Sequence, residues 1–339
     1  IPEALPGRAG EIVEQMSEEQ LVQMATGDPG KDQGNALGSA GISVPGSAAE
    51  TPLVAAEEPW NVASIALADG PAGLRLKKEY QVENGRIVPT DFLSALEGGF
   101  FATSKEKRGT SYYQYCTAIP VGTLLAQTWN RALIREVGAM IGTEMEYFGV
   151  TLWLAPGMNI HRNPLCGRNF EYYSEDPYLA GEIAAAFING VQSQHVGTSI
   201  KHFAANNQEY HRMSNSSEAD ERTLREIYFP AFETAVKKAQ PYTFMCSYNQ
   251  INGTFASENK WLLTDVLRGD WGFKGYVMSD WGAVNDRVKG LEAGLELEMP
   301  SSNGVNDALI VQAVKDGSLK EDILDQAVER ILRIIFEYA

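Results

Sequence analysis

The chain has 339 residues, of which 44% are hydrophobic and 21% charged, and its formal net charge is −16. This acidic balance argues against nucleic acid and anionic membranes as partners, because phosphate binding needs clustered Lys and Arg. No apolar run approaches the ~18 residues of a membrane-spanning helix. A neutral substrate such as a sugar is compatible with the charge.

The Cys and His content argues against a metal or disulfide framework. Cys116, Cys166 and Cys246 lie far apart, only four His are present, and no C-x-x-C motif occurs. We therefore predict no metal, no cofactor and reduced thiols, which suits a cytoplasmic protein. The chain begins at Ile1 without a signal-type segment, so sequence upstream of it is expected. A homo-oligomeric assembly is compatible with the sequence.

Residues 1–60 are predicted to form an N-terminal helix followed by a lead-in to the main domain. Residues 11–26 have an amphipathic helical pattern with a second start at Ser17, which has capping-box spacing to Gln20. Residues 27–59 are rich in Gly, Ala, Ser and Pro without a period, which is typical of a long loop.

Residues 61–339 are predicted to form an α/β domain of the (β/α)8 TIM-like barrel class. Short apolar, β-rich runs lie at 64–68, 151–155, 198–200, 243–247, 276–279 and 295–299. Helical patterns lie at 130–148, 177–195, 221–239, 259–268, 305–315 and 322–338. This alternation favours a parallel sheet with right-handed crossovers. Eight strands require one or two more, for which Ala118–Gly122 and the region near Ile42 are candidates, so we expect a barrel distorted in its first unit.

Unusual polar residues follow the predicted strands, and this pattern indicates an active site. Asp69 follows the first strand, residues 159–171 the second, Lys201-His202 the third, residues 247–249 the fourth, and Asp280-Trp281 the fifth. In a (β/α)8 barrel the carboxyl ends of the strands carry the catalytic residues. We therefore predict a barrel enzyme.

The mixture of carboxylates, cations and aromatic residues on this rim is the one that glycoside hydrolysis needs. The chain has no G-x-x-x-x-G-K phosphate loop, no G-x-S-x-G turn and no H-E-x-x-H helix. A phosphate-handling barrel would need a Gly-rich site near the last strands, where only Gly294 and Gly304 occur.

These motifs resemble glycoside hydrolase family 3, in its β-glucosidase branch. The matching stretches are Asp-Gly-Pro-Ala-Gly-Leu-Arg at 69–75, Gly-Arg-Asn-Phe-Glu at 167–171, Lys-His-Phe-Ala-Ala-Asn-Asn-Gln-Glu at 201–209, Ser-Tyr-Asn at 247–249 and Val-Met-Ser-Asp-Trp-Gly at 277–282. The resemblance implies a retaining β-glucosidase that releases glucose from the non-reducing end of β-glucosides through a covalent glycosyl-enzyme.

The resemblance also assigns roles to residues. Asp280 matches the family's nucleophile, and we expect Lys201 and Arg168 to lower its pKa. The alternative role for Asp280 is the N-cap of a helix. The alternative role for Asp69 is a turn residue. The substrate-binding candidates are Asp69, Arg168, Lys201 and His202 for hydroxyl groups and Met245, Tyr248 and Trp281 for apolar walls. Arg162 and Glu171 are weaker candidates, which structural ion pairs would also explain.

A retaining glycosidase also needs an acid/base carboxyl group about 5–5.5 Å from the nucleophile. In the family's β-glucosidases this Glu lies on a separate α/β sandwich domain, which we expect outside this chain. Residues 44–46 resemble the branch in which that domain precedes the barrel.

Two other possibilities stay open. His211 is the weaker internal acid/base candidate, since the β-N-acetylglucosaminidase branch uses a His in this loop. That branch has Pro-Gly-His-Gly after Phe, whereas residues 204–207 here are Ala-Ala-Asn-Asn. The other alternative is a carbohydrate-binding barrel without catalysis.

Overall fold

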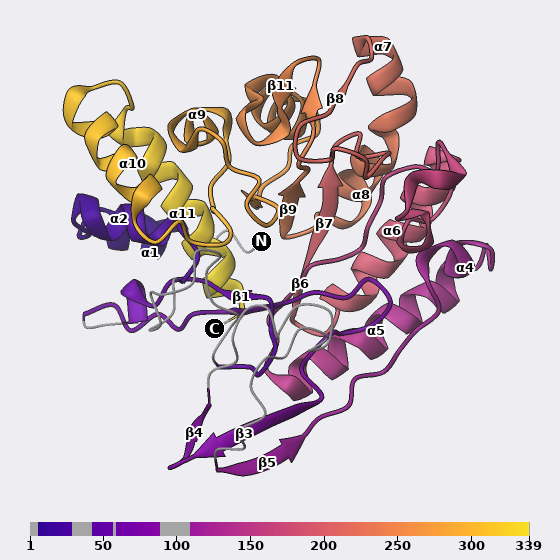
Figure 1. Ribbon diagram of the computed structural model, residues 1–339, viewed down its shortest axis with the longest axis horizontal. Helices are drawn as coiled ribbons and strands as arrows, with labels where there is room; N and C mark the ends of the chain where they lie inside the picture. Colours follow the sequence, from indigo (N-terminus) through magenta and orange to yellow (C-terminus); the bar gives the residue numbers. More distant parts are fainter. Residues whose placement is uncertain (1–5, 29–42, 57–58, 89–108, 339) are drawn as a thin grey trace.

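The computed structural model describes residues 6–28, 43–56, 59–88 and 109–338. Its main sheet has six strands in the order β1-β2-β6-β7-β9-β12 (Figure 1). The strands are β1 (Ala49–Glu50), β2 (Ala66–Ala68), β6 (Leu152–Trp153), β7 (Gly197–Phe203), β9 (Thr243–Cys246) and β12 (Tyr276–Met278). All neighbours pair in parallel except β1 and β2, which pair antiparallel. Five of the predicted apolar runs are therefore strands of one sheet.

Two further segments close this sheet into a barrel. Leu297 forms a parallel bridge with Met278, and Glu298 forms one with Thr26. The Asp28 N–H then donates to the carbonyl of Glu50 in β1, at 3.1 Å. The sheet thus runs from β12 through residues 297–298 and 26–28 back to β1, which gives the TIM-like barrel that the alternation predicts.

The candidate for an additional strand at Ala118–Gly122 was wrong. Residues 117–121 have no regular structure, and Gly122 begins the short helix α4 (Gly122–Ala126). Pro120 lacks the N–H that a strand ladder requires, which explains why this apolar run is not a strand. Ile42 lies outside the described residues. The segments that complete the ring are residues 26–28 and 297–298.

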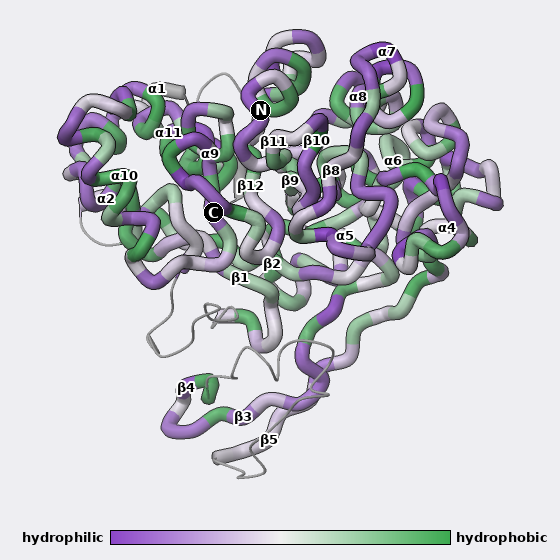
Figure 2. Tube along the Cα trace, turned by 45° about the horizontal axis from the view of Figure 1, so that its top comes forward, coloured by the Kyte–Doolittle hydropathy of each residue, from purple (hydrophilic) through white to green (hydrophobic). Residues whose placement is uncertain are grey.

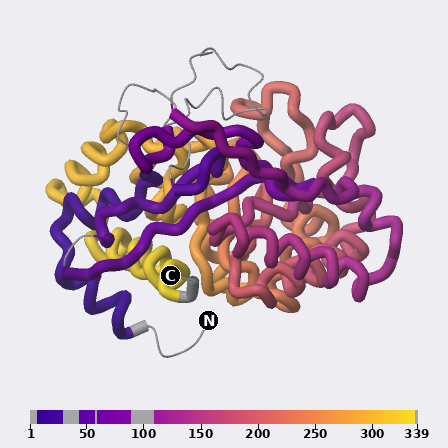
Figure 3. Tube along the Cα trace, turned by 90° about the horizontal axis from the view of Figure 1, so that it is seen from below, coloured from indigo at the N-terminus to yellow at the C-terminus, as the bar shows by residue number. Residues whose placement is uncertain are grey.

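Helices surround the barrel. Along one flank lie α5 (Arg131–Phe148), α6 (Pro177–Gln192) and α8 (Pro230–Ala239), side by side in Figure 1. Helices α5 and α6 approach closely because Gly138 and Gly190 leave room for the facing backbone: a Cβ at Gly190 would lie 2.2 Å from the Arg135 carbonyl. The opposite flank carries α1 (Pro6–Val13), α2 (Glu18–Met24), α9 (Arg287–Ala293), α10 (Val305–Asp316) and α11 (Glu321–Tyr338). Figure 3 shows α1 beside α11, where buried residues of both helices share one apolar cluster.

Local signals explain several helix boundaries. The predicted start at Ser17 is confirmed, because Ser17 and Gln20 form both hydrogen bonds of a capping box on α2. The pattern at 221–239 is divided into α7 (Glu221–Thr223), the π-helix η5 (Leu224–Tyr228) and α8, which begins at Pro230. The pattern at 259–268 is a π-helix, η7 (Trp261–Asp270).

Four 3₁₀ helices and two small sheets lie outside the main sheet in the part of the chain that the structure describes. The 3₁₀ helices are η1 (Val54–Ala56), η3 (Pro164–Cys166), η4 (Asn169–Glu171) and η6 (Ala256–Glu258). A small sheet joins β8 (Ser216–Ser217), β10 (Gln250–Ile251) and β11 (Thr254–Phe255). A second one, β3 (Glu79–Glu83), β4 (Arg86–Ile87) and β5 (Thr110–Tyr113), projects away from the barrel (Figures 1 and 2). No helix in the described ranges is long and apolar enough to cross a membrane.

Candidate active site

The polar residues that follow β2, β7 and β12 meet at one rim of the barrel. The Lys201 Nζ lies 2.6 Å from Asp69 Oδ1, which joins the end of β7 to the end of β2. The His202 Nε2 lies 3.6 Å from Asp280 Oδ2, which joins β7 to the end of β12. The prediction that these strand ends converge is therefore confirmed for these four residues.

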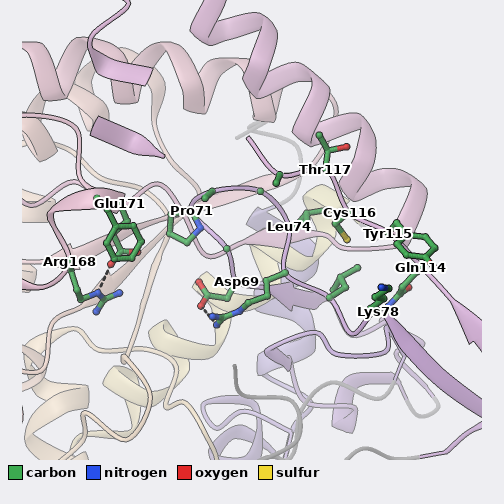
Figure 4. Close-up of a pocket in the computed structure, with 17 residues that line it drawn as sticks. Asp69, Pro71, Leu74, Lys78, Gln114, Tyr115, Cys116, Thr117, Arg168 and Glu171 are labelled. Carbon is green, nitrogen blue, oxygen red and sulfur yellow. Dashed lines mark hydrogen bonds and ion pairs between the residues drawn. The ribbon is translucent and has the colours of Figure 1, made fainter. Parts of the chain in front are cut away.

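Asp69 is held by two cations. Its Oδ1 accepts from Lys201 and its Oδ2 from Arg75, each at 2.6 Å. Figure 4 shows Asp69 at the edge of the neighbouring pocket. Burial would raise the pKa of Asp69, but the charges of Lys201 and Arg75 outweigh it and lower the pKa to about 2. The turn that follows is built from backbone bonds, Gly73 N–H to the Gly70 carbonyl and Arg75 N–H to the Asp69 carbonyl. The carboxylate is therefore ionised and faces the site.

Asp280 is buried and keeps one carboxylate oxygen unbonded. Its Oδ1 accepts from the Trp281 N–H at 2.7 Å, whereas its Oδ2 has no hydrogen-bond partner among the residues described. The cap of the next helix, α9, is Asp286, so Asp280 does not serve as an N-cap. The structure leaves this oxygen available to another molecule.

Two opposing effects set the pKa of Asp280. Lys201, Arg168 and Arg212 each lower the pKa of Asp280, but burial has the largest effect and the net pKa is raised above its usual value. The expectation that Lys201 and Arg168 lower the pKa of Asp280 is confirmed for both cations, whereas the larger, opposite effect of burial does not follow from the sequence.

His202 is a buried, neutral imidazole. Burial, and then the charges of Arg168, Lys201 and Arg212, hold its pKa well below the usual value. Consecutive strand residues normally point to opposite faces. Here the pairing of β7 with β9 shifts register between Ile200 and Phe203, and such irregularities re-aim side chains.

Two arginines complete the cationic surroundings. The Arg168 Nε forms an ion pair with Glu171, as drawn in Figure 4. The Arg168 Nη1 lies 4.0 Å from Glu209 Oε1. Arg212 bonds Glu209 at 3.1 Å and stacks 4.6 Å above the ring of Tyr248. The sequence assigns no role to Glu209 or Arg212, although both lie in the loop that directly follows Lys-His-Phe.

The weaker candidates have structural partners. Glu171 is the ion-pair partner of Arg168, whereas Arg162 stacks 5.8 Å from the ring of Tyr228. His211 is exposed, and its ring packs edge-on against Tyr210 with centroids 4.1 Å apart.

The predicted apolar walls lie at different depths. Tyr248 is buried and donates a hydrogen bond from its hydroxyl to the Trp281 carbonyl at 2.8 Å, which ties the loops after β9 and β12 together. Met245 is 3% exposed and belongs to the apolar cluster inside the barrel, against which Trp281 packs. Tyr248 and Trp281 are therefore the members closer to the rim.

A cavity of about 580 Å³ adjoins the site (Figure 4). Asp69 and Arg168 line it, together with Gly70, Pro71, Ala72, Gly73, Leu74, Arg75, Leu76, Lys78, Gln114, Tyr115, Cys116, Thr117, Ala118, Phe170 and Glu171. Asp280, Lys201 and His202 are not part of this lining, so the cavity extends from the Asp69 side of the site towards the base of β3 and β5. Within the described ranges no group of three or more His, Cys, Asp or Glu residues is arranged to hold a metal ion.

Comparison with known proteins places this geometry among glycosidases. The chain is 51% identical over 281 residues to thermostable β-glucosidase B of Acetivibrio thermocellus, covering 82% of this chain and 34% of that protein. It is 54% identical over 219 residues to exo-α-(1→6)-L-arabinopyranosidase of Bifidobacterium longum, covering 65% and 29%. The chain thus spans about a third of the length of these curated relatives.

A solved structure shares the fold over almost the whole chain. β-Glucosidase 3B of Thermotoga neapolitana in complex with α-D-glucose superposes with a TM-score of 0.80 at 42% identity, covering 97% of this chain and 42% of that one. The family model "Glycosyl hydrolase family 3 N terminal domain" matches residues 100–334. The chain therefore belongs to glycoside hydrolase family 3.

Proposed function

We propose that this chain is the catalytic barrel of a retaining β-glucosidase in which Asp280 is the nucleophile. The observation that carries the proposal is the buried, unbonded Oδ2 of Asp280, which lies at a barrel rim beside His202 and near Lys201 and Arg168. A carboxylate oxygen without a hydrogen-bond partner is free to attack an anomeric carbon and form a covalent glycosyl-enzyme. The nearby cations favour the ionised form that attack requires.

The remaining rim residues suit a neutral pyranoside. An ionised Asp69 offers acceptors to two neighbouring hydroxyl groups, whereas Lys201 and Arg168 offer donors. Tyr248 and Trp281 supply aromatic surface for the sugar ring. Relatives named β-glucosidases and a relative solved with bound glucose support β-glucosides as the substrate class.

We further propose that the acid/base carboxyl group comes from a part of the protein outside the barrel, in an α/β sandwich domain. Three carboxylates at the rim are engaged by cations: Asp69 by Lys201, Glu171 by Arg168, and Glu209 by Arg212. A proton donor to the leaving group needs a protonated carboxyl group instead. The exposure of His211 disfavours the β-N-acetylglucosaminidase-like mechanism.

A second candidate activity is the hydrolysis of α-L-arabinopyranosides, which the 54% identical Bifidobacterium relative favours. L-Arabinopyranose lacks the hydroxymethyl group of glucose, so the two substrates differ in what the protein contacts at that position. Comparing kcat/KM on the 4-nitrophenyl derivatives of both sugars distinguishes the two activities.

Covalent labelling tests the nucleophile. A 2-deoxy-2-fluoro-β-glucoside with an activated leaving group should add one fluoroglucosyl group to the protein, and peptide mapping should place it on Asp280. The substrate needs no protonation of its leaving group, so the test does not depend on the acid/base. A label on another residue would reject the assignment, and glucose binding without labelling would favour the non-catalytic barrel.

A further inference from the structure

Behind His202 lies a row of buried polar groups that the proposed reaction does not by itself require. The His202 Nδ1 lies 3.0 Å from the Tyr172 hydroxyl, and the amide nitrogen of Asn206 lies 3.4 Å from the same hydroxyl. The amide nitrogen is also 3.2 Å from Glu209 Oε1. Tyr172, His202 and Asn206 are each at most 1% exposed.

Glu209, at the end of this row, determines which groups donate and which accept along it. Glu209 is ion-paired with Arg212 at 3.1 Å, and a carboxylate oxygen only accepts hydrogen bonds. The Asn206 side chain must therefore turn its NH₂ group, and not its oxygen, towards Glu209. The second hydrogen of that NH₂ group is then directed at the Tyr172 oxygen.

Tyr172 consequently donates its hydroxyl hydrogen bond to the His202 Nδ1. Burial raises the pKa of Tyr172, so its hydroxyl group keeps its proton. Its oxygen accepts from Asn206, and of its two partners only the His202 Nδ1 is able to accept. An imidazole whose Nδ1 accepts a hydrogen bond, and which is neutral, carries its proton on Nε2.

We propose that Tyr172 is a positioning residue that fixes His202 in the Nε2–H tautomer, so that an N–H donor and not a lone pair faces the Oδ2 of Asp280. That oxygen is 3.6 Å from Nε2 and is unbonded among the described residues. The same N–H is available to a hydroxyl group of a sugar bound beside Asp280. The opposite tautomer would direct a lone pair at the carboxylate and repel it. The functional part of this inference rests on the proposed role of Asp280, whereas the tautomer does not.

Nitrogen-15 NMR of the protein labelled at its histidines tests the tautomer directly. Only four histidines are present, so His202 is assigned by comparing spectra of His161→Gln, His195→Gln and His211→Gln. The His202 resonances should show a protonated Nε2 and an unprotonated, hydrogen-bonded Nδ1 near neutral pH. A protonated Nδ1 would overturn the proposal.

A pair of variants separates the contribution of Tyr172 from that of Asp280. In Asp280→Ala, where the carboxylate no longer favours Nε2–H, His202 should keep the single Nε2–H tautomer. In Asp280→Ala combined with Tyr172→Phe, both tautomers should appear. A single Nε2–H tautomer in the double variant would show that Tyr172 does not fix it. Because these spectra need no turnover, they stand even if labelling rejects Asp280 as nucleophile.

Kinetics provide the functional readout. Tyr172→Phe should lower kcat/KM on an aryl β-glucoside roughly tenfold, the size expected from one lost hydrogen bond. Tyr173→Phe is the matched control, because Tyr173 is an adjacent buried tyrosine that packs in the apolar cluster, and it should leave kcat/KM unchanged. Equal losses in the two variants would indicate general damage to packing and reject the positioning role.

Discussion

Asp69 and Lys201 form a 2.6 Å ion pair that spans the barrel rim from the end of β2 to β7, past the intervening strand β6. Lys201 is only 3% exposed, so its ammonium group depends on Asp69 for compensation. The pair therefore holds two strand ends together and orients two groups of the proposed sugar site.

Asp69→Asn should lower the free energy of unfolding by about 3–5 kcal/mol near pH 7, because it leaves a buried ammonium group unpaired. Adding Lys201→Met should recover part of the loss. Arg75→Ala removes the half-exposed partner of Asp69 and should cost less than about 1 kcal/mol. Denaturant unfolding of the four proteins measures these differences. Equal losses of unfolding free energy for Asp69→Asn and Arg75→Ala would contradict the dependence of Lys201 on Asp69.

The stabilisation by Asp69 should also depend on pH. Its pKa of about 2 in the folded protein is below the usual value of 3.8, so the ionised form is favoured by folding. The advantage of the unsubstituted protein over Asp69→Asn should be complete above about pH 4 and shrink as the pH falls towards 2. Thermal unfolding of both proteins over this range checks the trend.

Asp280→Asn should abolish turnover and stabilise the protein near pH 7, by about 0.5–2 kcal/mol. The pKa of Asp280 is raised on folding, so its ionisation opposes folding as the pH rises from the unfolded pKa through the folded one. The difference between the two melting temperatures should be smallest below about pH 4 and larger at neutral pH. A variant less stable than the unsubstituted protein at pH 7 would show that the ionised carboxylate is well compensated.

Arg212→Gln should shift the acidic limb of the pH profile of kcat/KM to higher pH. The charge of Arg212 lowers the pKa of Asp280, and its removal lets that pKa rise further, so a higher pH is needed to ionise the nucleophile. His211→Gln is the control at the adjacent, exposed position and should leave the limb in place. Movement of the limb in the control but not in Arg212→Gln would assign the effect to His211.

Arg287→Met should destabilise the barrel by about 3–5 kcal/mol. Its buried guanidinium group donates to the carbonyls of Ala25, Leu295 and Glu296 and lies 3.7 Å from Glu298. Arg222→Ala is the control, since that side chain is 83% exposed and pairs with Glu226 on the surface. Urea unfolding with both variants measures the two costs.

The sequence predicts the strands and site residues that have strong local signals. β9 and β12 are buried along their whole length and so appear as apolar runs. Residues 26–28 and 49–50 join through the backbone hydrogen bond from Asp28 to Glu50, and their small and polar residues show no period. The motifs predict the convergence of Asp69, Lys201, His202 and Asp280.

Two properties of the site depend on tertiary packing and escape sequence reasoning. The raised pKa of Asp280 results mainly from burial by residues distant in the chain. The contact of Tyr172 with His202 joins the residue after η4 to strand β7, 30 residues apart in sequence, and nothing in either motif specifies it.

The closure of the barrel has a consequence for how the chain assembles. The bond from Arg287 to the Ala25 carbonyl joins residues 262 positions apart, so the last seam forms only after most of the chain has been synthesised. Until then residues 297–298, which extend the sheet beyond β12, present an unpaired strand edge, which is a template for pairing with other chains. By pairing with each other, residues 26–28 and 297–298 thus protect the protein against aggregation. Loss of residues 26–28 would expose an unpaired strand edge while the other strands stay paired.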